Sequence, residues 1–89
     1  MTTTITSILL TNGFETRSEN TLWWGIGSLV WGWIAEVRDL GGDLYEARYQ
    51  HWFYDQWGDP VEDTDEVVVL HGARALEYLF ERLPLWRYR

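Results

Sequence analysis

The chain has 89 residues, and its composition and charge exclude several classes of protein. Hydrophobic residues make up 46% of it and aromatic residues 17%, which is typical of a folded domain rather than a disordered segment. The absence of cysteine excludes disulfides, thiolate zinc sites and cysteine nucleophiles. Fourteen acidic residues against seven basic ones give a formal charge of −7, which argues against direct binding to nucleic acid or to an anionic membrane. We expect a single domain spanning residues 1–89.

The chain shows no targeting or membrane-spanning pattern. Its first residues lack the basic stretch that opens a secretory signal. The longest apolar stretch, Leu22 to Ala35, is interrupted by glycines and is too short to cross a bilayer as a helix. We therefore expect a cytoplasmic protein that does not contact a membrane.

The first residues of the chain predict a β-hairpin. Ile5–Thr11 is rich in β-branched residues and is followed by Asn12-Gly13, the dipeptide most typical of a type I′ turn. Phe14–Ser18 is then expected to return as the second, antiparallel strand.

The region from Leu22 to Leu40 is compatible with either a helix or strands. Three interior glycines would each cost a helix about 1 kcal/mol, and apolar residues alternate along Trp31–Val37 at the period of a strand. We predict strands here, with a turn at Gly25–Ser28. Asp39–Asp43 contains two glycines and is expected to form the next hairpin turn.

The second half of the chain predicts two more strands and a helix. Leu44–Tyr54 alternates so that Tyr45, Ala47, Tyr49 and His51 share one face. The remaining elements follow in order: a loop at Asp55–Thr64, a short buried strand at Glu66–Leu70, and a helix at Ala73–Leu83 that ends at Pro84.

Together these elements predict an α+β fold: an antiparallel β-meander of about four to five strands, with one C-terminal helix packed on one face. The helix face is expected to contain Ala73, Leu76, Leu79, Phe80 and Leu83. The expected core of sheet and helix is Val67, Val69, Leu76, Leu79 and Phe80. Trp86, in the apolar and basic C-terminal segment, is expected to fold back on the domain.

No catalytic motif is present. Ser28 lacks the glycine spacing of a nucleophile elbow, and Gly25-Ile26-Gly27 is only half of a dinucleotide-binding pattern. His51 and His71 are the only imidazoles, so a metal-assisted enzyme would need both to converge with carboxylates. We favour a structural role for His51 and a helix-capping role for His71, and expect no enzyme activity, metal or cofactor.

The most distinctive feature is an acidic block without a basic residue. It consists of Asp55, Asp59, Glu62, Asp63, Asp65 and Glu66. One interpretation is a solvated loop that keeps the protein soluble. A second is a calcium site, although the spacing does not follow the EF-hand pattern. A third is recognition of a basic protein surface through charge complementarity.

Seven tryptophans allow two interpretations. Most of them, namely Trp23, Trp24, Trp31, Trp33 and Trp52, are expected to pack between sheet and helix. Trp52, Tyr54 and Trp57 lie next to the acidic block in the sequence, and aromatic residues of this kind anchor protein interfaces. The same three side chains would also suit a small ligand-binding or carbohydrate-binding β-domain.

Our leading hypothesis is a non-enzymatic, acidic protein-binding module. It would inhibit a nucleic-acid-binding enzyme or defence complex by occupying its basic surface, as a mimic of nucleic acid. In size and charge the chain is similar in type to small phage inhibitors of the anti-CRISPR and anti-restriction kind, although no motif of such a family is present. A homodimer is compatible with this hypothesis. The residues expected to contact the partner are Asp55, Trp57, Asp59, Glu62, Asp63, Asp65, Glu66, Trp52 and Tyr54.

Overall fold

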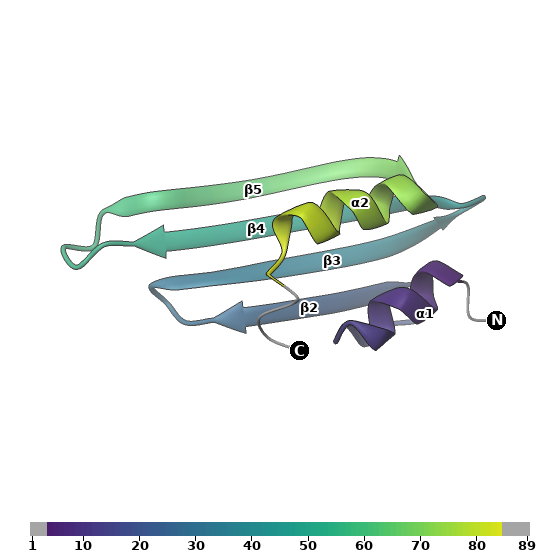
Figure 1. Ribbon diagram of the computed structural model, residues 1–89, viewed down its shortest axis with the longest axis horizontal. Helices are drawn as coiled ribbons and strands as arrows, with labels where there is room; N and C mark the ends of the chain where they lie inside the picture. The colour runs from purple at the N-terminus through teal and green to yellow at the C-terminus, as the bar shows by residue number, and fades with distance from the viewer. Residues whose placement is uncertain (1–3, 85–89) are drawn as a thin grey trace.

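The structure, a computed structural model, describes residues 4–84 and consists of one antiparallel sheet with two helices (Figure 1). The five strands are neighbours in chain order, β1-β2-β3-β4-β5. The elements are α1 (Thr4–Thr11), β1 (Glu15–Ser18), β2 (Thr21–Gly27), β3 (Trp31–Gly41), β4 (Leu44–Tyr54), β5 (Pro60–His71) and α2 (Gly72–Arg82). The predicted α+β meander with a C-terminal helix is confirmed. The expectation for Trp86 lies outside the described residues.

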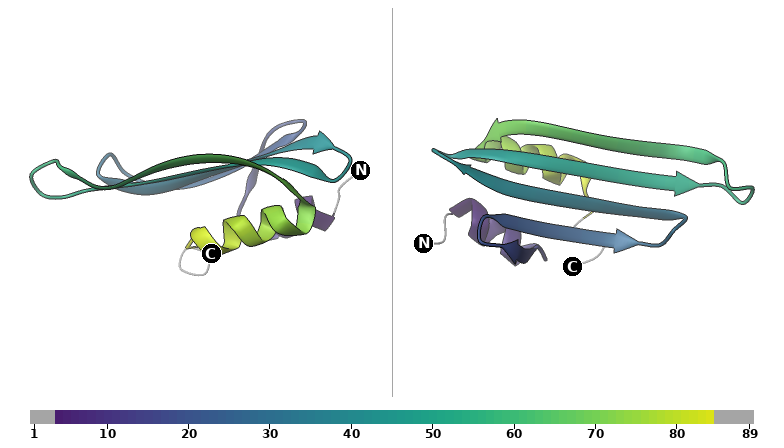
Figure 2. Two further views of the ribbon diagram at one scale, coloured as in Figure 1. Left: turned by 90° about the horizontal axis from the view of Figure 1, so that it is seen from above. Right: turned by 180° about the vertical axis from the view of Figure 1, so that it is seen from behind.

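Both helices lie on the same side of the sheet, which we call the inner face (Figure 2). The 11 residues of β4 extend about 36 Å at the rise of a strand. The 11 residues of α2 extend only about 16 Å at the rise of a helix. The end of the sheet that carries the β2–β3 and β4–β5 turns therefore projects beyond α2 (Figure 1).

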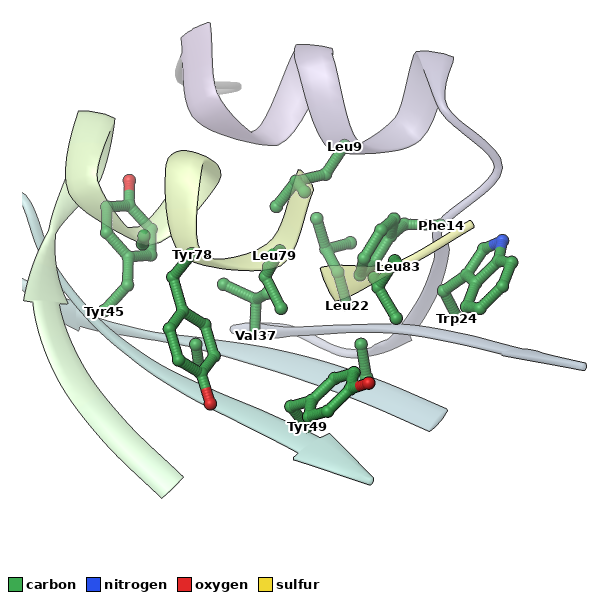
Figure 3. Close-up of a cluster of buried hydrophobic side chains, with 13 residues drawn as sticks. Leu9, Phe14, Leu22, Trp24, Val37, Tyr45, Tyr49, Tyr78, Leu79 and Leu83 are labelled. Atoms are coloured by element: carbon green, nitrogen blue, oxygen red, sulfur yellow. The ribbon is translucent and has the colours of Figure 1, made fainter. Parts of the chain in front are cut away.

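The hydrophobic core lies between the helices and the middle of the inner face (Figure 3). Every second residue of each strand points to this face, where these side chains meet those of α1 and α2. Leu9 of α1 and Leu79 of α2 are the largest fully buried side chains of the described residues. The other core residues are Phe14, Leu22, Trp24, Ala35, Val37, Tyr45, Ala47, Tyr49, Ala75, Tyr78 and Leu83.

The N-terminal hairpin prediction is wrong in its first strand, because Thr4–Thr11 forms helix α1. Leu9 is buried in the core, and this tertiary contact outweighs the β propensity of the segment. Gly13 adopts a left-handed φ of 95°, and Phe14 donates a backbone hydrogen bond to Leu9. An Asn-Gly pair ends helices through the same left-handed conformation that it supplies to hairpin turns.

The predicted strands between residues 22 and 40 are confirmed as β2 and β3. β2 continues to Gly27, so the turn lies further along the chain than the expected Gly25–Ser28. The β3–β4 hairpin is also confirmed. Gly41 and Gly42 have positive φ values of 88° and 62°, which glycine adopts without strain. Asp43 has a φ of 64°, a left-handed conformation that aspartate tolerates at single positions.

The segment between β4 and α2 differs most from expectation. The predicted loop Asp55–Thr64 is confined to its first residues, because β5 begins at Pro60 and pairs with β4 from there on. The predicted short buried strand Glu66–Leu70 is part of this longer strand, and Val67 and Val69 are exposed. Their side chains lie on the face of the sheet away from the helices, which we call the outer face.

Helix α2 begins one residue earlier than expected and buries a different face. Gly72, Ala75, Tyr78 and Leu79 are its buried residues. Ala73 and Phe80 are exposed and Leu76 is half-buried, so the predicted helix face is wrong at Ala73 and Phe80. Tyr78 takes the place assigned to Phe80, since a tyrosine ring can fill a core as well as a phenylalanine ring.

Most of the tryptophans among residues 4–84 lie outside the core. Of the five tryptophans expected between sheet and helix, only Trp24 is buried. Trp23 and Trp52 alternate onto the outer face, whereas Trp31 and Trp33 lie on the inner face but are only half-buried. The inner face therefore carries tryptophans that the helices do not cover.

Candidate functional site

An apolar hollow opens on the inner face, at the end of the sheet that projects beyond α2. Its volume is about 470 Å³, and its lining residues are Trp31, Trp33, His51, Phe53, Val61 and Glu62. We call it the aromatic hollow. It lies on the same face as the core but outside the cover of the helices.

Strand register places the rings of the aromatic hollow in two neighbouring rows. Trp33 is opposite His51 and Trp31 is opposite Phe53 across β3 and β4. The Trp33 and His51 rings are stacked, with centroids 4.5 Å apart and an angle of 6° between planes. Trp31 meets Trp33 edge to face at 6.1 Å. These contacts hold the rings in a fixed arrangement, and a site that is already ordered binds at a lower entropy cost than a flexible one.

Further apolar side chains are exposed at the same end of the molecule. Leu29 and Val30 occupy the β2–β3 turn, with Leu29 93% exposed. Trp57 in the β4–β5 turn is 77% exposed, and Phe53 and Val61 at the hollow are also exposed. Exposed apolar residues that gather in one region are typical of protein interaction sites.

The structure divides the acidic block into residues that support the fold and residues that do not. Asp55 Oδ1 accepts hydrogen bonds from the backbone N–H groups of Trp57 and Asp59, each at 2.9 Å. This carboxylate therefore shapes the β4–β5 turn. Asp65 forms an ion pair with Arg48, with Nη2 and Oδ2 3.1 Å apart. Neither of these two side chains is a free contact for a partner.

The four other carboxylates remain available along β5 and its turn. Asp59, Asp63 and Glu66 are exposed, and their side chains have no hydrogen bond or ion pair with another described residue. Glu62 accepts a hydrogen bond from Thr64 Oγ1 at 2.7 Å and lines the aromatic hollow. We call these four residues the acidic edge. Strand alternation places Glu62 and Glu66 on the inner face and Asp63 on the outer face.

The predicted aromatic trio is not brought together on the aromatic hollow. Trp52 lies on the outer face, against Gly32, and its Nε1 donates a hydrogen bond to Ser28 O at 2.8 Å. Tyr54 is half-buried at the end of β4, and Trp57 stands exposed in the turn. Trp57 is therefore the member of the trio that is most accessible to a partner.

The outer face carries three ion pairs that link different strands; the pair of Arg17 and Glu36 spans β2, and the other two join neighbouring strands. Arg17 pairs with Glu36 at 2.8 Å and Arg38 pairs with Glu46 at 3.0 Å. The Arg48 guanidinium, hydrogen-bonded to Asp65, holds the pKa of that carboxyl below its usual value. Three arginines are thus matched by carboxylates on their own face, whereas Asp63 on the same face has no ion pair among the described residues.

The two histidines do not form a metal site. His51 is opposite Thr64 and His71 is opposite Leu44, so the two lie seven residues apart along the β4–β5 pair, or about 23 Å. Across residues 4–84, no group of three or more acidic or imidazole side chains is placed to hold a metal ion. His71 occupies the N-cap position of α2 as expected, but its side chain makes no capping hydrogen bond.

Sequence reasoning missed most of the aromatic hollow. Trp31, Trp33, His51, Phe53 and Val61 were not among the expected partner-binding residues. Strand alternation does place the first three on the helix side of the sheet. The lengths of the predicted helix and strands could have indicated the aromatic hollow, because an 11-residue helix covers less than half of an 11-residue strand.

Within residues 4–84, no helix is both long and apolar enough to cross a membrane. Comparison of the chain with protein-family models, with curated proteins and with solved structures finds no match.

Proposed function

We propose that the protein is a non-enzymatic binding module that docks the aromatic hollow and the acidic edge onto a basic surface of another protein. The observation that carries this proposal is the position of Glu62, which lines the aromatic hollow and belongs to the acidic edge. An apolar centre with a charged rim is the usual composition of a protein interface. The charge of the rim then selects a partner with lysine and arginine around an apolar group.

The partner class we propose is a nucleic-acid-binding protein. Such proteins expose clusters of lysine and arginine that contact phosphates, and the acidic edge is complementary to them in charge. A module that covers those residues would inhibit nucleic-acid binding. Because Asp55 and Asp65 are engaged within the fold, the proposed contact relies on apolar anchoring as much as on an imitation of phosphate charge.

The first experiment identifies the partner by site-specific cross-linking. A photoreactive phenylalanine analogue is placed at Phe53, in the aromatic hollow, and in a second protein at Leu40. Both side chains are exposed, but Leu40 lies near the opposite end of the sheet, by the β3–β4 turn. We expect a cross-linked partner from position 53 that is absent from position 40. Equal products from both positions would contradict a specific site at the aromatic hollow.

The second experiment tests the charge of the site with the partner so identified. One variant combines Asp59→Asn, Glu62→Gln and Asp63→Asn. Its control combines Glu15→Gln, Glu19→Gln and Glu77→Gln, which removes the same charge from exposed positions elsewhere. We expect the first variant to associate more slowly at low salt and to lose most of the salt dependence of the association rate. Equal association rates for both variants would refute a directed role for the acidic edge.

A further inference from the structure

The free edge of β5 is a second surface that could bind a partner, because it offers backbone groups for pairing with another strand. β5 is the last strand of the sheet and pairs with β4 alone. It has 12 residues, whereas β1 at the opposite edge has only four and a register irregularity. Among residues 4–84, no helix or strand pairs with the outer side of β5.

The register shows which backbone groups of β5 face this edge. Gly72 N donates to Asp43 O, and the pairing of β4 with β5 continues without a shift to Phe53 and Glu62. Backbone groups alternate in direction along an antiparallel strand, so the even-numbered residues of β5 bond to β4. Tyr54 N donates to Val30 O on the other side of β4, which agrees with this assignment. The N–H and C=O groups of Asp63, Asp65, Val67 and Val69 therefore face away from the sheet.

The charges along this edge disfavour pairing with a second copy of the chain. Carboxylates occur on both faces of the strand near its middle, with Glu62 and Glu66 on the inner face and Asp63 on the outer face. A two-fold antiparallel pairing centred on this region would place carboxylates opposite carboxylates, which is destabilising. The same carboxylates would attract a strand that carries arginine or lysine.

We propose that the free edge of β5 binds an extended basic segment of the partner protein as a sixth, antiparallel strand. The charge of that segment rests on the proposed function, whereas the mode of binding is inferred from the register. Addition of a strand to a sheet edge obtains affinity from main-chain hydrogen bonds and specificity from alternate side chains. Basic side chains opposite the acidic edge and apolar side chains opposite Val67 and Val69 would match β5 on both faces.

A designed peptide tests this mode without knowledge of the partner. The probe is the capped octapeptide Val-Thr-Val-Arg-Thr-Thr-Arg-Arg, which pairs antiparallel with β5 from Val69 to Glu62 and places threonine, not arginine, opposite Asp65, because Asp65 is already paired with Arg48. Its control has the same sequence and charge but carries N-methyl groups on its third, fifth and seventh residues. Those residues lie opposite Val67, Asp65 and Asp63, so methylation removes the donors that face β5.

With the full-length protein, we expect the probe to slow amide hydrogen exchange at the edge-facing residues Asp63, Asp65, Val67 and Val69. The methylated peptide should bind roughly tenfold or more weakly, because three main-chain hydrogen bonds to β5 are lost. Equal affinities for the two peptides would show that only charge attracts them and would overturn the proposal. Pairing of two copies of the chain through β5, seen in sedimentation as dimers that Val67→Pro abolishes, would overturn it as well.

A proline substitution supplies an independent test on the protein itself. Val67→Pro removes an N–H that faces the free edge and leaves the ladder to β4 intact, which edge strands tolerate. We expect this variant to keep its fold and to lose most of its affinity for the probe, whereas the control Val67→Thr keeps both. Retained affinity in a folded Val67→Pro variant would contradict strand addition. Because Val67 lies outside the aromatic hollow, that result would leave the proposed function standing.

Discussion

The indole of Trp23 lies against Gly25 on the outer face of β2, so closely that a Cβ atom at residue 25 would come within 2.5 Å of Trp23 Cζ2. The guanidinium of Arg17 lies 5.0 Å from the centre of the same indole. Trp23 thus lies between the guanidinium of Arg17 and the backbone at Gly25. A side chain at residue 25 would displace it from the sheet.

This relationship predicts a coupled pair of substitutions. Gly25→Ala should lower the free energy of unfolding by about 1–2 kcal/mol, because the added methyl group overpacks the indole. In a Trp23→Leu background the same substitution should cost much less, since the nearest atoms around the new methyl group belong to Trp23. Chemical denaturation of the four proteins measures the coupling. Equal costs in both backgrounds would show that the indole is not what excludes a side chain.

The core of α2 predicts a contrast between adjacent residues. Leu79→Ala should destabilise the protein by about 2–5 kcal/mol, as is usual for a buried leucine. Phe80→Ala should cost much less, because Phe80 is 40% exposed whereas Leu79 is fully buried. Thermal melting of the two variants ranks them. A larger loss of melting temperature for Phe80→Ala would contradict the observed orientation of α2.

The ion pair between Arg48 and Asp65 predicts a change in acid titration. Hydrogen bonding to Arg48 lowers the pKa of Asp65 below its usual 3.8, so the pair stabilises the fold above that value and loses its effect as the pH falls through the lowered pKa. Arg48→Gln should raise the pKa of Asp65 in the folded protein. NMR titration of the Asp65 carboxyl measures it, with Arg38→Gln as the control. An unchanged pKa in Arg48→Gln would refute the ion pair.

The hydroxyl of Tyr78 predicts a substitution that does not destabilise the protein. This buried oxygen has no hydrogen-bond partner among the described residues, so Tyr78→Phe should leave stability unchanged or raise it by up to about 1 kcal/mol. Tyr49→Phe is the control, because Tyr49 shares a hydrogen bond with Trp33 and should lose about 1 kcal/mol. Denaturation at neutral pH separates the two.

The buried Tyr78 also predicts that the free energy of unfolding falls at alkaline pH. Burial raises the pKa of Tyr78 above its usual 10.0, so the unfolded chain releases this proton first and stability falls as the pH rises through that value. Tyr78→Phe should make this fall shallower. Denaturation between about pH 9 and 11 compares the slopes, and identical slopes would contradict the assignment.

The exposed Trp57 predicts a kinetic signature once the partner of the proposed function is in hand. Trp57→Ala should accelerate dissociation roughly tenfold, since interface tryptophans often contribute more than 1 kcal/mol. The salt dependence of association should stay close to that of the unaltered protein, because no charge is removed. Surface plasmon resonance at two salt concentrations measures both rates. A change confined to the association rate would argue against Trp57 as an apolar anchor.

Local sequence patterns determined the central part of the sheet. Period-two alternation and the Gly41-Gly42 turn place β3 and β4 correctly, because an antiparallel hairpin is specified by its own residues and its turn. The α+β class and the approximate extent of the C-terminal helix follow from similar local signals. The acidic block was equally visible, since it is a property of composition alone.

Only the tertiary structure decided which of these residues are available to a partner. Whether Thr4–Thr11 forms a helix depended on the burial of Leu9 against distant residues, and whether Asp65 is free depended on Arg48 in the neighbouring strand. The aromatic hollow exists because α2 is shorter than the strands beneath it. Burial of a side chain, pairing of two charges and coverage of a sheet by a helix all depend on residues far apart in the chain, so a local sequence pattern does not predict them.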